Sequence, residues 1–228
     1  MATKFKCIYW NIHGISSKVF GDKTKDPKLL EIVSDYDIVC FSELHTDKNI
    51  SIPSFKLKKQ KFRPRTHKGP KISGGLAVFI KHNIEKNFTV MHNTNVDSIW
   101  IKNNIQQLHL GFYYCSPENI KSKFFETVNN EIGTMCNETN TYIFGDFNAR
   151  TKVCCENIIA DKFDEELGIS SDMYDSPYSR NSEDLKIVNK RGKDFLKICR
   201  INNFCIANGR VLGDLFGKYT CHQKKARA

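Results

Sequence analysis

The segment 145–150, Gly-Asp-Phe-Asn-Ala-Arg, carries a carboxylate and a side-chain amide directly after the apolar run 142–144. The two groups belong to Asp146 and Asn148. Alternate residues of an extended strand point to the same face, so if extended geometry persists both side chains face one pocket. A carboxylate can accept a proton from water, and a neutral amide can donate a hydrogen bond to a charged oxygen. The pair therefore suits the hydrolysis of a phosphate ester.

The elements that must position this pair alternate between strand-like and helical patterns. Short apolar or alternating runs predict strands over residues 4–12, 37–42, 75–81, 98–102, 107–115 and 141–144. Apolar residues at helical spacing predict helices from residue 27, where a proline opens the first turn, and over residues 116–136 and 190–203. Residues 151–189 are polar and predict a long surface excursion. No repeat or linker divides the chain, so we expect one α/β domain over residues 1–228.

The composition is that of an ordinary soluble globular protein, with 40% hydrophobic and 26% charged residues. The longest apolar run, residues 76–80, is far shorter than the roughly 20 residues that cross a membrane. Residues 1–10 do not resemble a secretory signal. The nine cysteines show neither a Cys-x-x-Cys pair nor zinc-ligand spacing. We expect an intracellular protein in a reducing compartment, either nuclear or cytoplasmic.

The net charge of +10 is concentrated in residues 56–71, which contain eight Lys or Arg and no acid. Two prolines and a glycine in the same segment predict a loop. One interpretation is a solvated basic loop, and the other is a contact with DNA phosphates that weakens as salt rises. The candidate DNA-binding residues are Lys58, Lys59, Lys61, Arg63 and Arg65.

Four predicted strand ends deliver polar groups suited to a metal ion or a phosphate: Asn11, Glu43, Tyr114 and the Asp146/Asn148 pair. Each has an ordinary structural explanation when taken singly, such as a turn, a solvated acid or a core tyrosine. Together, in this order, they resemble the endonuclease/exonuclease/phosphatase superfamily. That resemblance implies a four-layered α/β sandwich, in which two packed mixed β-sheets are flanked by helices.

Within the superfamily, the sequence is similar to the endonuclease domain of non-LTR (LINE-type) retrotransposons over about residues 4–221. The shared motifs are Trp10-Asn11-Ile12-x-Gly14, Ser42-Glu43-x-His45-Thr46, Gly74-Gly75, Gly145-Asp-Phe-Asn-Ala149, Asn208-Gly209-Arg210 and Gly213-Asp214-x-x-Gly217-x-Tyr219-Thr220. The last two narrow the resemblance to the retroelement branch.

This resemblance implies a divalent cation, Mg²⁺ or in its place Mn²⁺, bound by Glu43 with Asn11 beside it. Such hard cations prefer oxygen ligands and keep several water molecules. The bound ion would neutralise the non-bridging phosphate oxygens and the leaving oxygen. No small-molecule cofactor and no membrane contact are implied.

The resemblance also implies catalytic roles. Asp146 would orient or deprotonate the attacking water, while Asn148 and Tyr114 would donate hydrogen bonds to the phosphate. Thr220 would support the site, and we expect His45 to be a packed or hydrogen-bonded histidine. The implied substrate is DNA, and the implied former context is a fusion to a reverse transcriptase.

The superfamily pattern continues with Ser-x-Ile-Asp-Tyr and a terminal Ser-Asp-His, and neither motif occurs in this sequence. The resemblance thus implies a domain that is incomplete at its C-terminus, with the final strands missing. Groups that act as a unit lose most of their rate enhancement when one is removed. We therefore expect this polypeptide by itself to have little or no nuclease activity. Robust Mg²⁺-dependent nicking of supercoiled plasmid, abolished by Asp146→Ala, would contradict this expectation.

Two alternatives stay open. A phosphoesterase of the same superfamily that acts on lipid or inositol phosphates would use the same core residues and differ only in its loops. A non-catalytic nucleic-acid-binding remnant would bind duplex DNA without cleaving it, and would lose affinity when the five basic candidates are neutralised.

Overall fold

The computed structural model describes residues 4–17, 21–63, 72–117, 123–136, 140–153, 180–211, 214–218 and 220. The chain forms two compact units, residues 1–147 and residues 148–228. That the whole chain is one domain stays a prediction. Among the described residues, no helix has the length and apolar character needed to cross a membrane.

Among the described residues, the first unit contains almost all of the regular structure. Its strands are β1 (Cys7–Asn11), β2 (Ser16–Ser17), β3 (Gly21–Asp22), β4 (Ile38–Ser42), β5 (Phe55–Lys61), β6 (Leu76–Lys81), β7 (Phe88–Met91), β8 (Ser98–Asn103), β9 (Leu108–Tyr114) and β10 (Thr141–Asp146). Its helices are α1 (Pro27–Ser34) and α2 (Phe124–Met135), with 3-10 turns at Lys23–Lys25 and Glu85–Asn87. In the second unit, the described residues form α4 (Lys190–Ile201).

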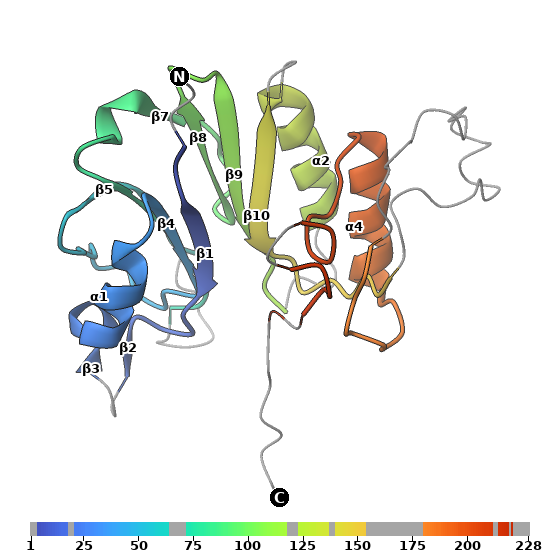
Figure 1. Ribbon diagram of the computed structural model, residues 1–228, viewed down its shortest axis with the longest axis horizontal. Coiled ribbons are helices and arrows are strands. Elements are labelled where there is room, and N and C mark those ends of the chain that lie inside the picture. The colour runs from blue at the N-terminus through green and yellow to red at the C-terminus, as the bar shows by residue number, and fades with distance from the viewer. Residues whose placement is uncertain are drawn as a thin grey trace, which may run out of the picture. The chain divides into compact units, whose positions relative to one another are not determined.

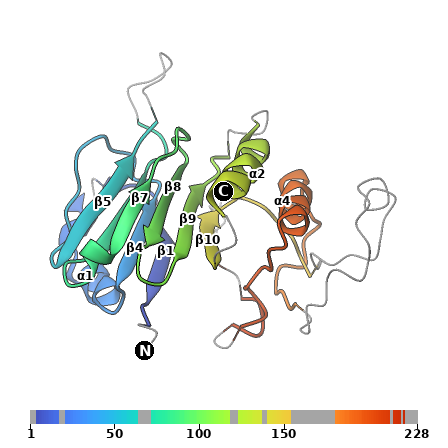
Figure 2. The same ribbon diagram turned by 90° about the horizontal axis from the view of Figure 1, so that it is seen from above.

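Two four-stranded sheets form the core of the first unit, with strand orders β1-β4-β6-β5 and β10-β9-β8-β7. The pairs β1/β4 and β9/β10 are parallel, whereas the other pairs in both sheets are antiparallel. Both sheets are therefore mixed. β2 and β3 form a separate antiparallel pair. Figures 1 and 2 show the sheets face to face within this unit.

One apolar layer joins the two sheets. Ile38 of β4 and Val78 of β6 pack in the same cluster as Ile101 of β8 and Phe112 of β9. All four are fully buried. Because alternate strand residues face opposite sides of a sheet, the neighbouring positions along these strands point to the two outer faces.

Each outer face is covered by a helix (Figures 1 and 2). Leu29 and Val33 of α1 pack on the first sheet in a cluster that includes Phe41. On the second sheet, the rings of Phe124 of α2 and Tyr113 of β9 meet edge to face, with centroids 6.4 Å apart. The layers run α1, sheet, sheet, α2, so the predicted four-layered α/β sandwich is confirmed.

The prediction of a loop over residues 56–71 is wrong for its first part. Residues 56–61 belong to β5, an edge strand whose Phe55 is buried and whose Leu57 packs partly buried against the core. A shift of register between Leu57 and Lys59 marks a β-bulge. Lysines and bulges on an edge strand discourage pairing with other chains, so the basic residues are compatible with a strand here. Residues 64–71 lie outside the described residues.

Smaller differences concern the bounds of elements. The helix predicted over 116–136 is α2, which begins at Phe124, and residues 118–122 lie outside the described part of the chain. The strand predicted over 141–144 is β10, which continues to Asp146. β7 was not predicted, and most of the predicted surface excursion, residues 154–179, lies outside the described residues.

Gly111 of β9 lies against the buried ring of Trp100, and a Cβ at this position would be 2.8 Å from that ring. We expect Gly111→Ala to lower the free energy of unfolding by about 1–3 kcal/mol through overpacking. Gly133 is the control, because a Cβ there would meet nothing within 4 Å. Gly133→Ala should instead stabilise α2, by up to about 1 kcal/mol. Urea unfolding measures both effects, and equal stability of the two variants would contradict the packing argument.

Candidate active site

Two parallel strand pairs bring four polar side chains to one end of the sandwich. In the first sheet, Asn11 is the register partner of Ser42, the residue before Glu43. In the second sheet, Tyr114 is the register partner of Asp146. Neighbouring parallel strands end at the same edge of a sheet. The carboxyl ends of β1, β4, β9 and β10 therefore deliver Asn11, Glu43, Tyr114 and Asp146.

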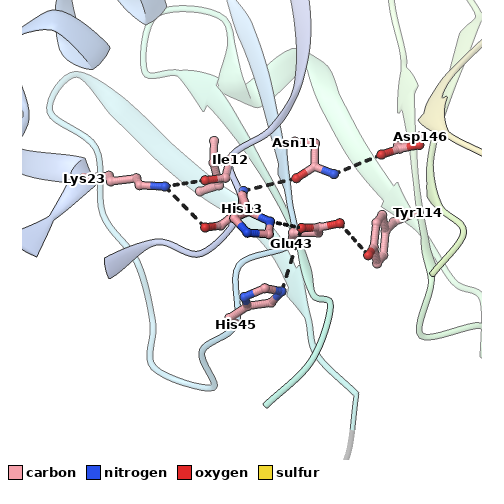
Figure 3. A network of polar contacts seen from close by, with 8 residues as sticks. All are labelled: Asn11, Ile12, His13, Lys23, Glu43, His45, Tyr114 and Asp146. Atoms are coloured by element: carbon pink, nitrogen blue, oxygen red, sulfur yellow. Dashed lines mark hydrogen bonds and ion pairs between the residues drawn. The ribbon is translucent and has the colours of Figure 1, made fainter. Parts of the chain in front are cut away.

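Hydrogen bonds link these four side chains across the two sheets (Figure 3). The Asn11 amide donates from Nδ2 to Oδ2 of Asp146 over 2.9 Å. The Tyr114 hydroxyl donates to Oε1 of Glu43 over 2.7 Å. Each bond joins a residue of one sheet to a residue of the other, so the pairing of the sheets sets the geometry of the site.

Glu43 is held as a carboxylate. Burial raises its pKa, but hydrogen bonds from Tyr114, Asn11 and His13 outweigh burial and leave the pKa below its ordinary value. The His13 contact joins Nδ1 to Oε2 of Glu43 over 2.9 Å. Burial, with the hydrogen bond to the Glu43 carboxylate, moves the Tyr114 pKa well above its ordinary value. Tyr114 is thus a protonated donor over the whole physiological pH range.

His13 was not singled out from the sequence. Its only signal is its place as the variable residue between Ile12 and Gly14 in the first motif. The Lys23 ammonium donates to the carbonyl oxygen of Ile12 over 2.5 Å and to that of His13 over 3.4 Å. Burial lowers the pKa of Lys23. Lys23 thus ties the 3-10 turn to the loop after β1.

The backbone beside the site is in an uncommon conformation. His13, Glu43 and His45 have φ angles of 49°, 53° and 55°, in the left-handed region that non-glycine residues seldom adopt. Backbone hydrogen bonds hold these residues: Gly14 N–H donates to the Glu43 carbonyl over 2.6 Å, and His45 N–H donates to the Gly74 carbonyl over 2.9 Å. Strain of this kind persists only where the surrounding structure enforces it.

His45 lies at the rim of the same group, with Nε2 4.0 Å from Oε2 of Glu43. Partial burial lowers its pKa, the Glu43 carboxylate opposes this effect, and the charges of His13 and Lys23 add to it. The net shift favours the neutral imidazole. This placement agrees with an interacting rather than an isolated histidine.

The ionisation of Glu43 predicts a pH-dependent stability. Its folded pKa lies below the ordinary value of 4.5. Its contribution to stability is therefore present above pH 4.5 and is lost as the pH falls through the folded pKa. We expect Glu43→Gln to lower the free energy of unfolding more at pH 7 than at pH 3, as measured in urea. Glu31→Gln, on an exposed position of α1, is the control. An equal loss at both pH values would contradict the prediction.

A divalent cation fits the donor set here only as a largely hydrated ion. Within the described ranges, no three His, Cys, Asp or Glu side chains group so that they could hold a metal ion. Glu43 and Asn11 nevertheless offer oxygens at adjacent strand ends, and the Glu43 carboxylate is ionised. Mg²⁺ commonly binds through one or two carboxylates and keeps its remaining ligands as water. Residues for such an ion are thus present.

Asn148 and Thr220 lie in the second unit. The φ angle of Asn148 is 48°, so the extended geometry of β10 does not persist to this residue. Its carbonyl oxygen accepts a hydrogen bond from Nδ2 of Asn189 over 3.2 Å. Thr220 is exposed. The roles of both residues stay predictions.

Described residues of the two C-terminal sequence motifs lie around Asn181 within the second unit. Asn181 N–H donates to the Gly209 carbonyl over 3.1 Å, and Nδ2 donates to the Leu215 carbonyl over 2.7 Å. Hydrogen bonds from backbone N–H groups, first that of Lys218, hold the Asp214 pKa below its ordinary value. A Cβ at Gly209 or Gly217 would lie about 2 Å from the Asn181 carbonyl oxygen, at 2.0 and 2.1 Å. These glycines and Asp214 therefore have a structural reason for their presence.

The candidate DNA-binding residues differ in their environments. Lys58 pairs with Glu85 over 2.5 Å. Lys61 donates to the Asn93 side chain over 2.6 Å, and burial lowers its pKa to about 8. Arg63 pairs with Asp97, whereas Lys59 is exposed. Arg65 lies outside the described residues.

Comparison with known proteins gives structural similarity but no sequence match. No family model matches the sequence, and no curated protein is significantly similar to it. One similar structure is an endonuclease/exonuclease/phosphatase family protein from Leptotrichia buccalis C-1013-b, with 16% identity, a TM-score of 0.44, and coverage of 64% of this chain and 67% of that chain.

A second similar structure is the endonuclease domain of TRAS1, a telomere-specific non-LTR retrotransposon, with 15% identity and a TM-score of 0.42, covering 72% of this chain and 68% of that one. A third is D. rerio TDP2 complexed with a single-strand DNA product, with 14% identity and a TM-score of 0.37, covering 72% and 64%.

The matches span about two thirds of the length of the first two superfamily structures, at 67% and 68%. Membership of the endonuclease/exonuclease/phosphatase superfamily stays a prediction from the sequence motifs.

Proposed function

We propose that the first unit carries the metal-dependent phosphodiesterase site of a DNA endonuclease. The observation that supports this proposal most directly is the pair of cross-sheet hydrogen bonds, Asn11 to Asp146 and Tyr114 to Glu43. They gather an amide, a phenol and two carboxylates at the carboxyl ends of four strands. This set contains a base for water, a donor for a phosphate oxygen and a carboxylate for a cation.

In the proposed reaction, Asp146 accepts the proton of the attacking water, and the hydrogen bond from Asn11 fixes the orientation of its carboxylate. The Tyr114 hydroxyl can turn from Glu43 toward a phosphate oxygen by rotation about its C–O bond, and it stabilises the charge that develops there. The sequence resemblance adds Asn148 as a second donor and Thr220 as a supporting residue, and both roles stay predictions. When bound at Glu43 and Asn11, Mg²⁺ or Mn²⁺ would neutralise the phosphate oxygens.

The proposed substrate is DNA, because a polyanion suits the basic segment 56–71. Lys59 has an exposed side chain on the edge strand β5 and is the first candidate for a phosphate contact. Lys58, Lys61 and Arg65 complete the proposed set. Binding through such contacts weakens steeply as salt rises. Non-catalytic binding of duplex DNA is the second candidate function, and the exposed Lys59 supports it independently of the catalytic groups.

The test is single-turnover nicking of supercoiled plasmid with excess protein, with Mg²⁺, with Mn²⁺ and with EDTA. Because one break changes the topology of a plasmid, this assay detects even a slow activity. Cation-dependent nicking supports the proposal. Salt-sensitive DNA binding without nicking favours the second candidate. Release of phosphate from inositol phosphates without nicking would contradict both.

We also propose that the chain derives from a non-LTR retrotransposon, on the strength of its motif order. Sequencing the DNA that flanks the coding region tests this origin. A neighbouring reverse transcriptase sequence, intact or decayed, is expected, and single-copy flanks without any such sequence would contradict it.

A further inference from the structure

Arg63 follows the edge strand β5 and forms a two-point ion pair with Asp97. Nε donates to Oδ1 over 2.8 Å, and Nη2 donates to Oδ2 over 2.7 Å. The two side chains are only 15% and 12% exposed. Two-point pairs between arginine and a carboxylate are stronger and geometrically more specific than ordinary surface ion pairs. The Arg63 guanidinium is thus committed to a partner within the fold.

Asp97 is connected directly to Tyr114 through the backbone. Its carbonyl oxygen accepts the N–H of Tyr114 over 3.0 Å. On its other side, the N–H of Asp97 donates to Oδ1 of Asn95 over 3.0 Å. The ion pair with Arg63 therefore fixes the side chain of Asp97, and the carbonyl oxygen of Asp97 fixes the backbone of Tyr114.

Arg63 and Tyr114 also lie beside the same residue, Gly74. A Cβ placed on Gly74 would lie 3.4 Å from Cε1 of Tyr114 and 3.6 Å from Cδ of Arg63. The tyrosine ring and the arginine stem thus flank the same glycine. At the far end of the ring, the hydroxyl donates to Glu43. Any tilt of the Tyr114 ring beside Gly74 therefore moves its hydroxyl group.

We propose that Arg63 and Asp97 are a positioning pair that orients Tyr114 toward the phosphate, and that Arg63 is not a DNA contact. This inference rests on the proposed function, in which Tyr114 is the donor. It gives Arg63 a role different from that of the exposed Lys59 only a few residues earlier on the same segment. Loss of Arg63 acts on the rate of the chemical step, whereas loss of Lys59 acts on DNA affinity.

The kinetic test compares Arg63→Lys, Lys59→Met and Lys81→Met. Arg63→Lys keeps the charge and loses the two-point geometry. We expect it to lower the single-turnover rate constant by about 100-fold, a typical result of a 1 Å misplacement, with DNA affinity and its salt dependence unchanged. Lys81→Met is the matched control, since Lys81 pairs with Asp37 over 3.5 Å and its N–H donates to the Asp37 carbonyl. Lys59→Met should lower DNA affinity with little change in the rate at saturation.

A double-mutant cycle separates positioning from a general loss of structure. If Arg63 acts through Tyr114, Arg63→Lys should have almost no further effect in a Tyr114→Phe background. Equal fold-losses in both backgrounds would overturn the proposal. So would a fall in DNA affinity and salt slope with an unchanged rate constant, which is the pattern of a phosphate contact.

Amide hydrogen exchange followed by NMR provides a readout that does not depend on activity. Arg63→Lys should speed exchange of the Tyr114 N–H, which Asp97 protects, and leave exchange of the Lys81 N–H unchanged. If the fold is perturbed too far, Arg63→Met with Asp97→Asn removes both charges together and should give the same exchange pattern. An unchanged Tyr114 exchange rate overturns the positioning role. Absent nicking with faster Tyr114 exchange would favour the second candidate function, DNA binding without cleavage, and would still support the positioning pair.

Discussion

Asp146→Ala is expected to nick supercoiled plasmid about 100- to 10,000-fold more slowly than the unaltered chain, the range that one general base contributes. Asp146 ends β10, and its carboxylate is oriented by Nδ2 of Asn11 at 2.9 Å. Alanine removes both the proton acceptor and the partner of that amide. Single-turnover nicking with excess protein measures the change.

Asp146→Asn separates these two losses. Asparagine can still accept the hydrogen bond from Asn11 but is not a base, so the rate should fall nearly as far as with alanine. Asp35→Asn, at an exposed position after α1, is the control and should nick at the normal rate. Normal nicking by Asp146→Asn would contradict the role as base and leave Asp146 a structural partner of Asn11.

Glu43→Gln is expected to remove most of the response to divalent cations, lowering the nicking rate at fixed Mg²⁺ by roughly 100-fold or more. The carboxylate that would bind the ion is 2.7 Å from the Tyr114 hydroxyl and 2.9 Å from Nδ1 of His13. Glutamine has nearly the same shape and carries no charge. A titration of the nicking rate with Mg²⁺, and of bound Mn²⁺ by electron paramagnetic resonance, measures the effect.

If Glu43→Gln weakens the apparent affinity for the cation, the variant has lost a metal ligand rather than only distorted the site. If Glu43→Gln slows nicking at every Mg²⁺ concentration by the same factor, Glu43 does not bind the ion. His13→Ala offers a comparison, because it removes a contact to the same carboxylate and keeps the charge. We expect it to weaken the response to Mg²⁺ less than Glu43→Gln does.

The strands that carry the site were predictable because they are the most apolar parts of the sequence. Ile38–Ser42 and Leu76–Lys81 are buried along nearly their whole length, and their continuous apolar runs leave no competing explanation. The positions where these strands end were predicted from the ends of the same apolar runs. Asn11, Glu43, Tyr114 and Asp146 could therefore be assigned to strand ends before any tertiary contact was known.

Predictions that depended on charge were less successful. β5 carries lysines at four of its seven positions and looked like a loop, because edge strands lack the apolar signal of buried ones. The same charge pattern made Arg63 a DNA-binding candidate, which stays a prediction, but it gave no sign that the guanidinium pairs with Asp97, more than thirty residues away along the chain. The sequence does not show which opposite charge a charged residue pairs with, because ion pairs form between elements that only the fold brings together.

The sequence by itself thus determined the residue types at the strand ends and most of the strands that carry them, because local apolar periodicity is encoded residue by residue. Only the tertiary structure decided which of these groups meet. The bonds from Asn11 to Asp146 and from Tyr114 to Glu43 each cross from one sheet to the other. They depend on the packing of two sheets whose relative placement is set by the buried layer between them, and local sequence does not specify that placement.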